Sequence, residues 1–123
     1  MHRSGTSMLT GLLSKGYGYD LGEGKDKSKL IRPNKSNQKG HFELKSVARQ
    51  NDAFLWGQGL TWKKNVDKYS YLKTTESLQN NKLPILAGIV SLQALMNRTD
   101  KMSQIPWIVK DPRMCITLKN WLL

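Results

Sequence analysis

The first side chains suited to chemistry lie at the start of the chain, where Arg3, Ser4, Gly5, Thr6 and Ser7 follow one another. A glycine lets the backbone approach a ligand closely, and hydroxyls and N–H groups at the start of a helix attract anions. These residues predict a cradle for a phosphate or sulfate group. Two simpler interpretations stay open: Thr6 or Ser7 caps the following helix, and Arg3 is a solvated arginine.

A second group lies at positions 41 and 43. Glu43 is an isolated carboxylate in a basic stretch, and such a group can act as a general base toward an acceptor hydroxyl. The same glutamate would also stabilise the dipole of a helix that begins here, without any catalysis. His41 is a second candidate base because histidine titrates near neutral pH, although a loop histidine is more often simply solvated.

A third group, Lys110, Asp111 and Arg113, follows the apolar run 105–109, whose β-branched residues predict a buried strand. Open α/β sheets bind ligands at the carboxyl ends of their parallel strands. We therefore expect Lys110 to stabilise charge that develops on a leaving group, and Arg113 to hold an anionic acceptor. An ion pair between Asp111 and Arg113 is the structural alternative.

Apolar residues at helical spacing predict the elements that position these groups. The predicted helices cover residues 8–13, 42–55, 85–96 and 114–123, with a weaker surface helix within 63–82. The first helix is expected to be buried and to end at Lys15 and Gly16. Asn51 is the one polar residue in the apolar stripe of the second helix, and we expect a buried, hydrogen-bonded amide. The polar, lysine-rich residues 22–40 predict a mobile basic loop.

The composition limits the classes of protein that fit. A chain of 123 residues is one small domain at most, and its single cysteine, Cys115, excludes an internal disulfide and a cysteine-based zinc site. The net charge of +11 predicts anionic partners: nucleic acid, acidic lipid, a phosphorylated cofactor or a sulfated sugar. The aromatic residues do not interleave with the lysines, which disfavours specific nucleic-acid binding. No apolar run approaches the about 20 residues of a membrane span.

Three segments together resemble the sulfotransferase family, in particular its bacterial-type branch. Residues 2–7, HRSGTS, resemble the loop that holds the 5′-phosphosulfate of the donor. Residues 39–43, KGHFE, are similar to a Lys-Gly-aromatic-Phe-Glu segment, and residues 107–115, WIVKDPRMC, to a Trp-x-x-Lys-Asp-Pro-Arg-Leu-Cys strand end. Their order and spacing match the family, and they frame nearly the whole chain.

The resemblance implies an α/β fold of the P-loop type, with a parallel sheet and flanking helices, over one partial domain at 1–123. Its parts would be the phosphosulfate loop and helix at 1–16, the basic loop at 22–40, and the strand with its Lys-Asp-Pro-Arg end at 105–113. The donor would be 3′-phosphoadenosine 5′-phosphosulfate (PAPS), with no metal, and the acceptor a hydroxyl or amine of a glycan or small molecule. The implied site residues are Arg3, Ser4, Gly5, Thr6 and Ser7 for PAPS, Glu43 and Lys110 for catalysis, and His41 and Arg113 for the acceptor.

The chain departs from the family's pattern at both ends. The family has a strand before the loop, and after the Lys-Asp-Pro-Arg strand a further strand whose Arg and Ser hold the 3′-phosphate of PAPS. We therefore expect an N-terminal fragment, mostly helical with one clear strand, that has no measurable activity and a weak residual anion site. A P-loop nucleotide or phosphate transferase is an alternative, disfavoured because Thr6 stands where the Walker pattern has lysine. A non-catalytic basic protein that binds polyanions is the other.

Overall fold

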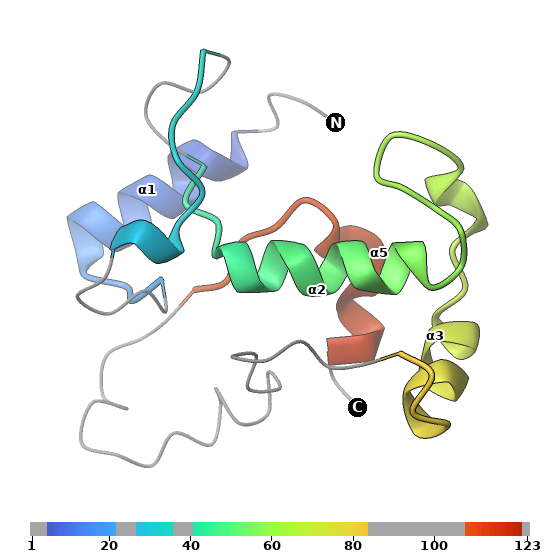
Figure 1. The fold of residues 1–123 in the computed structure, drawn as a ribbon. Coiled ribbons are helices and arrows are strands. Elements are labelled where there is room, and N and C mark those ends of the chain that lie inside the picture. Colours follow the sequence, from blue (N-terminus) through green and yellow to red (C-terminus); the bar gives the residue numbers. More distant parts are fainter. Residues whose placement is uncertain (1–4, 22–26, 36–40, 84–107, 122–123) are drawn as a thin grey trace. The chain divides into compact units, whose positions relative to one another are not determined.

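A computed structural model of the chain describes residues 5–21, 27–35, 41–83 and 108–121. This part of the chain is mostly helical, with four α-helices, two short 3₁₀-helices and no sheet (Figure 1). The chain divides into two compact units. The first unit comprises Met1–Lys45 and Arg98–Pro112, and the second comprises Ser46–Asn97 and Arg113–Leu123.

Helix α1, Thr6–Tyr17, is the longest element of the first unit among the described residues. It begins after Gly5, whose φ of 76° lies in the left-handed region that glycine adopts without strain. It ends before Gly18, whose φ of 73° lies in the left-handed region and lets the N–H groups of Gly18 and Tyr19 donate to the carbonyls of Ser14 and Leu13. The helix predicted over 8–13 is confirmed, and it continues past Gly16 to Tyr17.

Most of the apolar side chains of α1 are exposed, so the prediction of a buried helix is wrong. Met8 is 78% exposed, Leu9 54% and Leu12 56%. Two small residues one helical turn apart, Ser7 and Gly11, make contacts of α1 with other segments of the first unit. At Gly11 the absence of a side chain lets the Phe42 ring come close to the helix backbone.

Backbone hydrogen bonds join distant segments of the first unit. The 3₁₀-helix η1, Lys27–Lys29, precedes an isolated antiparallel bridge between Leu30 and Leu44. The N–H of the next residue, Ile31, donates to the carbonyl of Glu43 at 2.8 Å. Part of the predicted basic loop is thereby held against the segment that carries Glu43.

The parallel sheet of the predicted P-loop fold is not confirmed. Of the strand predicted over 105–109, residues 108 and 109 are described, and neither belongs to a strand. Ile108 donates its N–H to the carbonyl of Asp20 at 2.8 Å, but a ladder needs a partner strand, and the described residues hold none. Residues 105–107 and the helix predicted over 85–96 lie outside the described residues.

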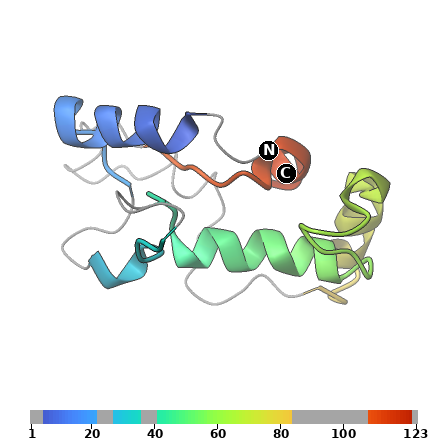
Figure 2. The same ribbon diagram turned by 90° about the horizontal axis from the view of Figure 1, so that it is seen from above.

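The second unit contains the other helices predicted from periodicity. They are α2, Lys45–Trp56, α3, Tyr71–Gln79, and α5, Met114–Trp121, with the 3₁₀-helix η2, Val66–Lys68, before α3. Seen from above, α3 lies beside the C-terminal end of α2 (Figure 2). The surface helix predicted within 63–82 is confirmed. The helix predicted over 42–55 is confirmed from Lys45 onward, and the one predicted over 114–123 is confirmed to Trp121, since residues 122–123 lie outside the described residues. None of the described helices is long and apolar enough to cross a bilayer.

A buried amide joins α2 to α5. Asn51 is fully buried, and its Oδ1 accepts hydrogen bonds from Thr117 Oγ1 and Trp121 Nε1, both at 2.8 Å. The Trp121 ring also packs edge-to-face on Phe54, with centroids 5.9 Å apart. The prediction of a buried, hydrogen-bonded amide at Asn51 is confirmed for Oδ1, whereas Nδ2 is buried with no hydrogen-bond partner among the described residues. The two donors to Oδ1 hold α5 in one register along α2.

A second polar contact joins α5 to the start of α3. The side chain of Asn120 donates to the carbonyl of Tyr71 and to Thr75 Oγ1, both at 3.1 Å. Its Oδ1 accepts the hydroxyl of Tyr69 at 2.6 Å. Burial raises the pKa of the Tyr69 hydroxyl above its usual 10.0, against a smaller lowering by its hydrogen bond with Thr74. The phenol therefore keeps its proton and its role as donor at neutral pH.

Candidate functional site

The first unit brings together three candidate residues that lie far apart in the sequence. Lys110 Nζ donates a hydrogen bond to Ser7 Oγ at 3.2 Å, across a separation of 103 positions. The same ammonium group forms an ion pair with Glu43, 67 positions away. Lys110 therefore links the first turn of α1 to the segment that precedes α2.

The ion pair is largely buried. The side chains of Lys110 and Glu43 are 10% and 7% exposed. Charges in such surroundings are strongly destabilised unless each has a partner, so the two groups depend on each other. Helix α2 begins at Lys45 and has no acidic residue in its first turn, so the interpretation of Glu43 as a partner of the helix dipole is wrong. Its charge faces Lys110 instead.

The start of α1 has the features expected of an anion cradle. The N-terminal cap is Gly5, with no side-chain hydrogen bond to the helix, so the interpretation of Thr6 or Ser7 as the capping residue is wrong. Both hydroxyl residues stand in the first turn, where backbone N–H groups point along the positive end of the helix dipole. Lys110, whose charge is paired with Glu43, donates a hydrogen bond to Ser7. Binding of an anion here stays a prediction, and Arg3 and Ser4 lie outside the described residues.

A contact between Phe42 and α1 positions Glu43, and the sequence did not reveal it. Phe42 has a φ of 54°, a left-handed conformation that is unusual for a residue with a bulky side chain. Its ring lies so close to Gly11 that a Cβ atom there would be 3.0 Å from two ring carbons. Lys15 Nζ lies 5.4 Å from the ring centroid. A glycine inside a helix was the available signal, because it often marks close approach of another segment.

His41 precedes this contact and has a distinctive environment. Its Nε2 atom is buried, with no hydrogen-bond partner in the part of the chain that the structure describes. The interpretation of His41 as a solvated loop histidine therefore does not apply to this nitrogen. Its predicted contact with the acceptor stays a prediction.

Arg113 lies in the second unit and has a structural partner there. Its Nε atom is 2.8 Å from Asp52 Oδ1, in an ion pair that joins the start of α5 to α2. The sequence did not suggest Asp52 as a partner. Asp111, in the first unit, is 6% exposed. The predicted role of Arg113 toward an acceptor stays a prediction.

Similarity to known proteins does not identify the function of this site. Within the described ranges, no group of three or more His, Cys, Asp or Glu side chains could hold a metal ion. The resemblance to sulfotransferases stays a prediction from the three sequence segments. Comparison of the chain with models of protein families, with curated proteins and with solved structures found no match.

Proposed function

We propose that this chain is part of a PAPS-dependent sulfotransferase, which transfers a sulfuryl group to an acceptor hydroxyl or amine. The observation that carries the proposal is the contact of Lys110 with both Ser7 and Glu43 at the N-terminus of α1. One residue from each of the three family-like segments takes part in it. If the similarity of these three short segments to the family were accidental, there would be no reason to expect their residues to contact one another.

The three residues supply what sulfuryl transfer requires. PAPS, when bound, supplies an activated sulfuryl group whose leaving group is a phosphate. Lys110 and the first turn of α1 would hold the phosphosulfate and stabilise the charge that develops on the phosphate. Ser7 would donate its hydroxyl to the same group, and Glu43 would take the proton of the acceptor.

The ion pair suggests how Glu43 becomes available as a base. Without an anion, the positive charge of Lys110 holds the Glu43 carboxylate. An anion at the start of α1 would compete for the same ammonium group and weaken its hold on the carboxylate. Donor binding would thereby prepare Glu43 to accept a proton, which couples the two halves of the site.

Calorimetric titration of the chain with PAPS, and separately with ATP and Mg²⁺, tests the proposal. We expect weak binding of PAPS and none of ATP with Mg²⁺. Lys110→Met should weaken PAPS binding about 10- to 100-fold, the range for a hydrogen bond to a charged group. Because that change leaves Glu43 without its cation, Ser7→Ala serves as a second variant and should weaken binding about two- to tenfold.

Lys29→Met is the matched control, since it removes one exposed lysine of the same unit. It should change the affinity for PAPS less than about twofold. Equal binding of PAPS by the chain and by both site variants would overturn the proposal. Tighter binding of ATP with Mg²⁺ than of PAPS would instead favour a nucleotide or phosphate transferase.

A further inference from the structure

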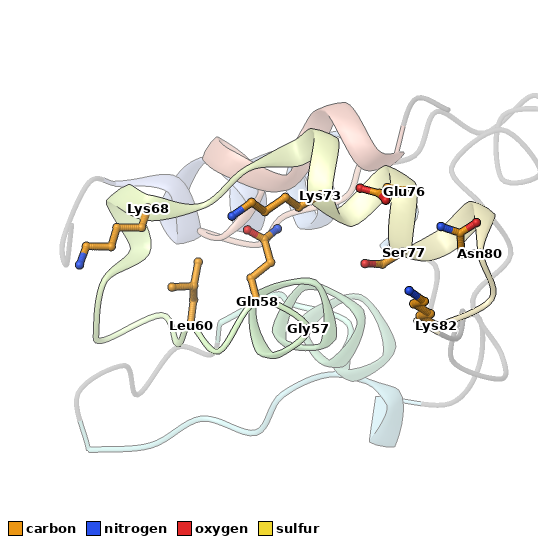
Figure 3. A pocket seen from close by; sticks show the side chains of 9 residues that line it. All are labelled: Gly57, Gln58, Leu60, Lys68, Lys73, Glu76, Ser77, Asn80 and Lys82. Atoms are coloured by element: carbon orange, nitrogen blue, oxygen red, sulfur yellow. The ribbon is translucent and has the colours of Figure 1, made fainter.

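The second unit contains a pocket that the proposed function does not use. It lies between the turn after α2, η2 and α3, and has a volume of about 560 Å³ (Figure 3). This volume falls within the range of small-molecule sites, about 300–1,000 Å³. The residues that line it are Gly57, Gln58, Leu60, Lys68, Lys73, Glu76, Ser77, Asn80 and Lys82.

The pocket carries an excess of positive charge. Lys68, Lys73 and Lys82 line it, against the single carboxylate of Glu76. None of these four side chains takes part in an ion pair with another described residue. Like charges around a hollow raise the local positive potential, so an anion that enters would meet groups whose charges are not already neutralised.

One wall of the pocket is held in place by Gln58. Its Nε2 donates to the carbonyl of Ser70 at 2.7 Å and to Thr74 Oγ1 at 2.8 Å, and its Oε1 accepts the N–H of Ser70 at 3.1 Å. These three bonds fix the end of α2 against the first turn of α3. This wall of the pocket is therefore in place before a ligand arrives, which reduces the entropy lost on binding.

The charges are unevenly distributed along the pocket. Lys68 lies at one end with its ammonium group pointing away from the other labelled side chains, Lys73 lies beside Gln58 nearer the middle, and Glu76, Asn80 and Lys82 lie toward the other end (Figure 3). The two lysines make the first half of the pocket positive, whereas the second half carries one charge of each sign, on Glu76 and Lys82. Ser77 and Asn80 add neutral donors and acceptors there, which suit hydroxyl groups.

We propose that this pocket binds a hydroxylated small molecule that carries one phosphate or sulfate ester, such as a sugar phosphate. The ester group lies at the Lys68 and Lys73 end, and the hydroxyls face Ser77 and Asn80. The inference is independent of the proposed function, because it involves neither PAPS nor any residue of the first unit.

Titration of the whole chain with glucose 6-phosphate, glucose 6-sulfate, glucose and inorganic phosphate at constant ionic strength tests the inference. We expect both esters to bind, inorganic phosphate to bind more weakly, and glucose not to bind. The double variant Lys68→Gln and Lys73→Gln should weaken binding of glucose 6-phosphate about fivefold or more. It removes two lysine–phosphate ion pairs, and each exposed pair contributes up to about a factor of five to the affinity. Glu76→Gln should tighten it.

Lys63→Gln combined with Lys64→Gln is the matched control, because it removes the same charge from two exposed lysines of this unit that do not line the pocket. It should change the affinity less than about twofold. Equal weakening in the control and the pocket variant would overturn the inference, because binding would then depend on net charge alone. Glucose or inorganic phosphate binding as tightly as the esters would also overturn it.

Discussion

Removing either one of the two charges of the buried ion pair should destabilise the first unit strongly. Lys110→Met leaves the Glu43 carboxylate, 7% exposed, without a cation, and Glu43→Leu leaves the Lys110 ammonium, 10% exposed, with Ser7 as its described partner. Removal of one member of a buried pair costs about 3–5 kcal/mol. A whole domain is stable by only about 5–15 kcal/mol, so either variant should lose a large part of its stability.

The double variant Glu43→Leu and Lys110→Met should be far more stable than the sum of the two single losses predicts. It removes both charges together, and replacing a buried pair by apolar groups is often close to neutral. The coupling free energy between the two positions should therefore reach about 3 kcal/mol. Urea denaturation followed by circular dichroism gives the four free energies of unfolding, and hydrogen exchange of the α1 amides locates the loss in the first unit.

Lys29→Met again serves as the control and should lie within about 0.5 kcal/mol of the unchanged chain. Single losses below about 1 kcal/mol would be typical of an exposed ion pair and would refute the burial of these charges. Additive losses in the double variant would refute the contact itself.

Three further changes test other contacts. Gly11→Ala should destabilise the first unit by about 1–3 kcal/mol in urea denaturation, because the added methyl group meets the Phe42 ring. Gly16→Ala should instead stabilise α1 by up to about 1 kcal/mol, because its methyl group meets only the side chain of Leu12, at 3.4 Å. Asn51→Leu should cost about 1–3 kcal/mol, because it leaves the buried indole N–H of Trp121 without its acceptor, whereas the Thr117 hydroxyl keeps the Arg113 carbonyl. A thermal melt unchanged from the original chain would contradict this. The folded state holds the Tyr69 proton more tightly than the unfolded chain, so its stabilisation should be lost as pH rises above about 10, and Tyr69→Phe should reduce that alkaline loss.

Helical periodicity predicted where helices form in this chain. Helical spacing places Leu44, Val47, Ala48, Phe54 and Leu55 on one face. The last four are buried in α2, whereas Leu44 precedes the helix and is half-buried. Periodicity did not predict what covers a helix face. The same reasoning placed the apolar stripe of α1 inside, because a stripe indicates only that burial would be favourable and not that the chain has a segment to cover it.

Contacts between distant segments were predictable only in part. Motif similarity placed Glu43 and Lys110 in one site. It did not predict their ion pair, because that contact depends on how the fold brings together backbone positions 67 residues apart. The segment that carries Glu43 is held by the Phe42 ring against Gly11. The glycine within a helix signals that some segment comes close, but it does not identify Phe42 as the residue that does. The acceptors of Thr117 and Trp121 likewise follow from tertiary packing, although the buried position of Asn51 was readable from its place in an apolar stripe.

Nuclear magnetic resonance of the isotopically labelled chain during titration with PAPS would locate the anion site directly. The proposed function predicts that the largest shift changes occur at the backbone amides of Gly5, Thr6 and Ser7 and at Lys110, and that the amides of α3 change little. Shift changes confined to the second unit, or none at Ser7 and Lys110 once the titration saturates, would contradict the proposed role of this site in donor binding.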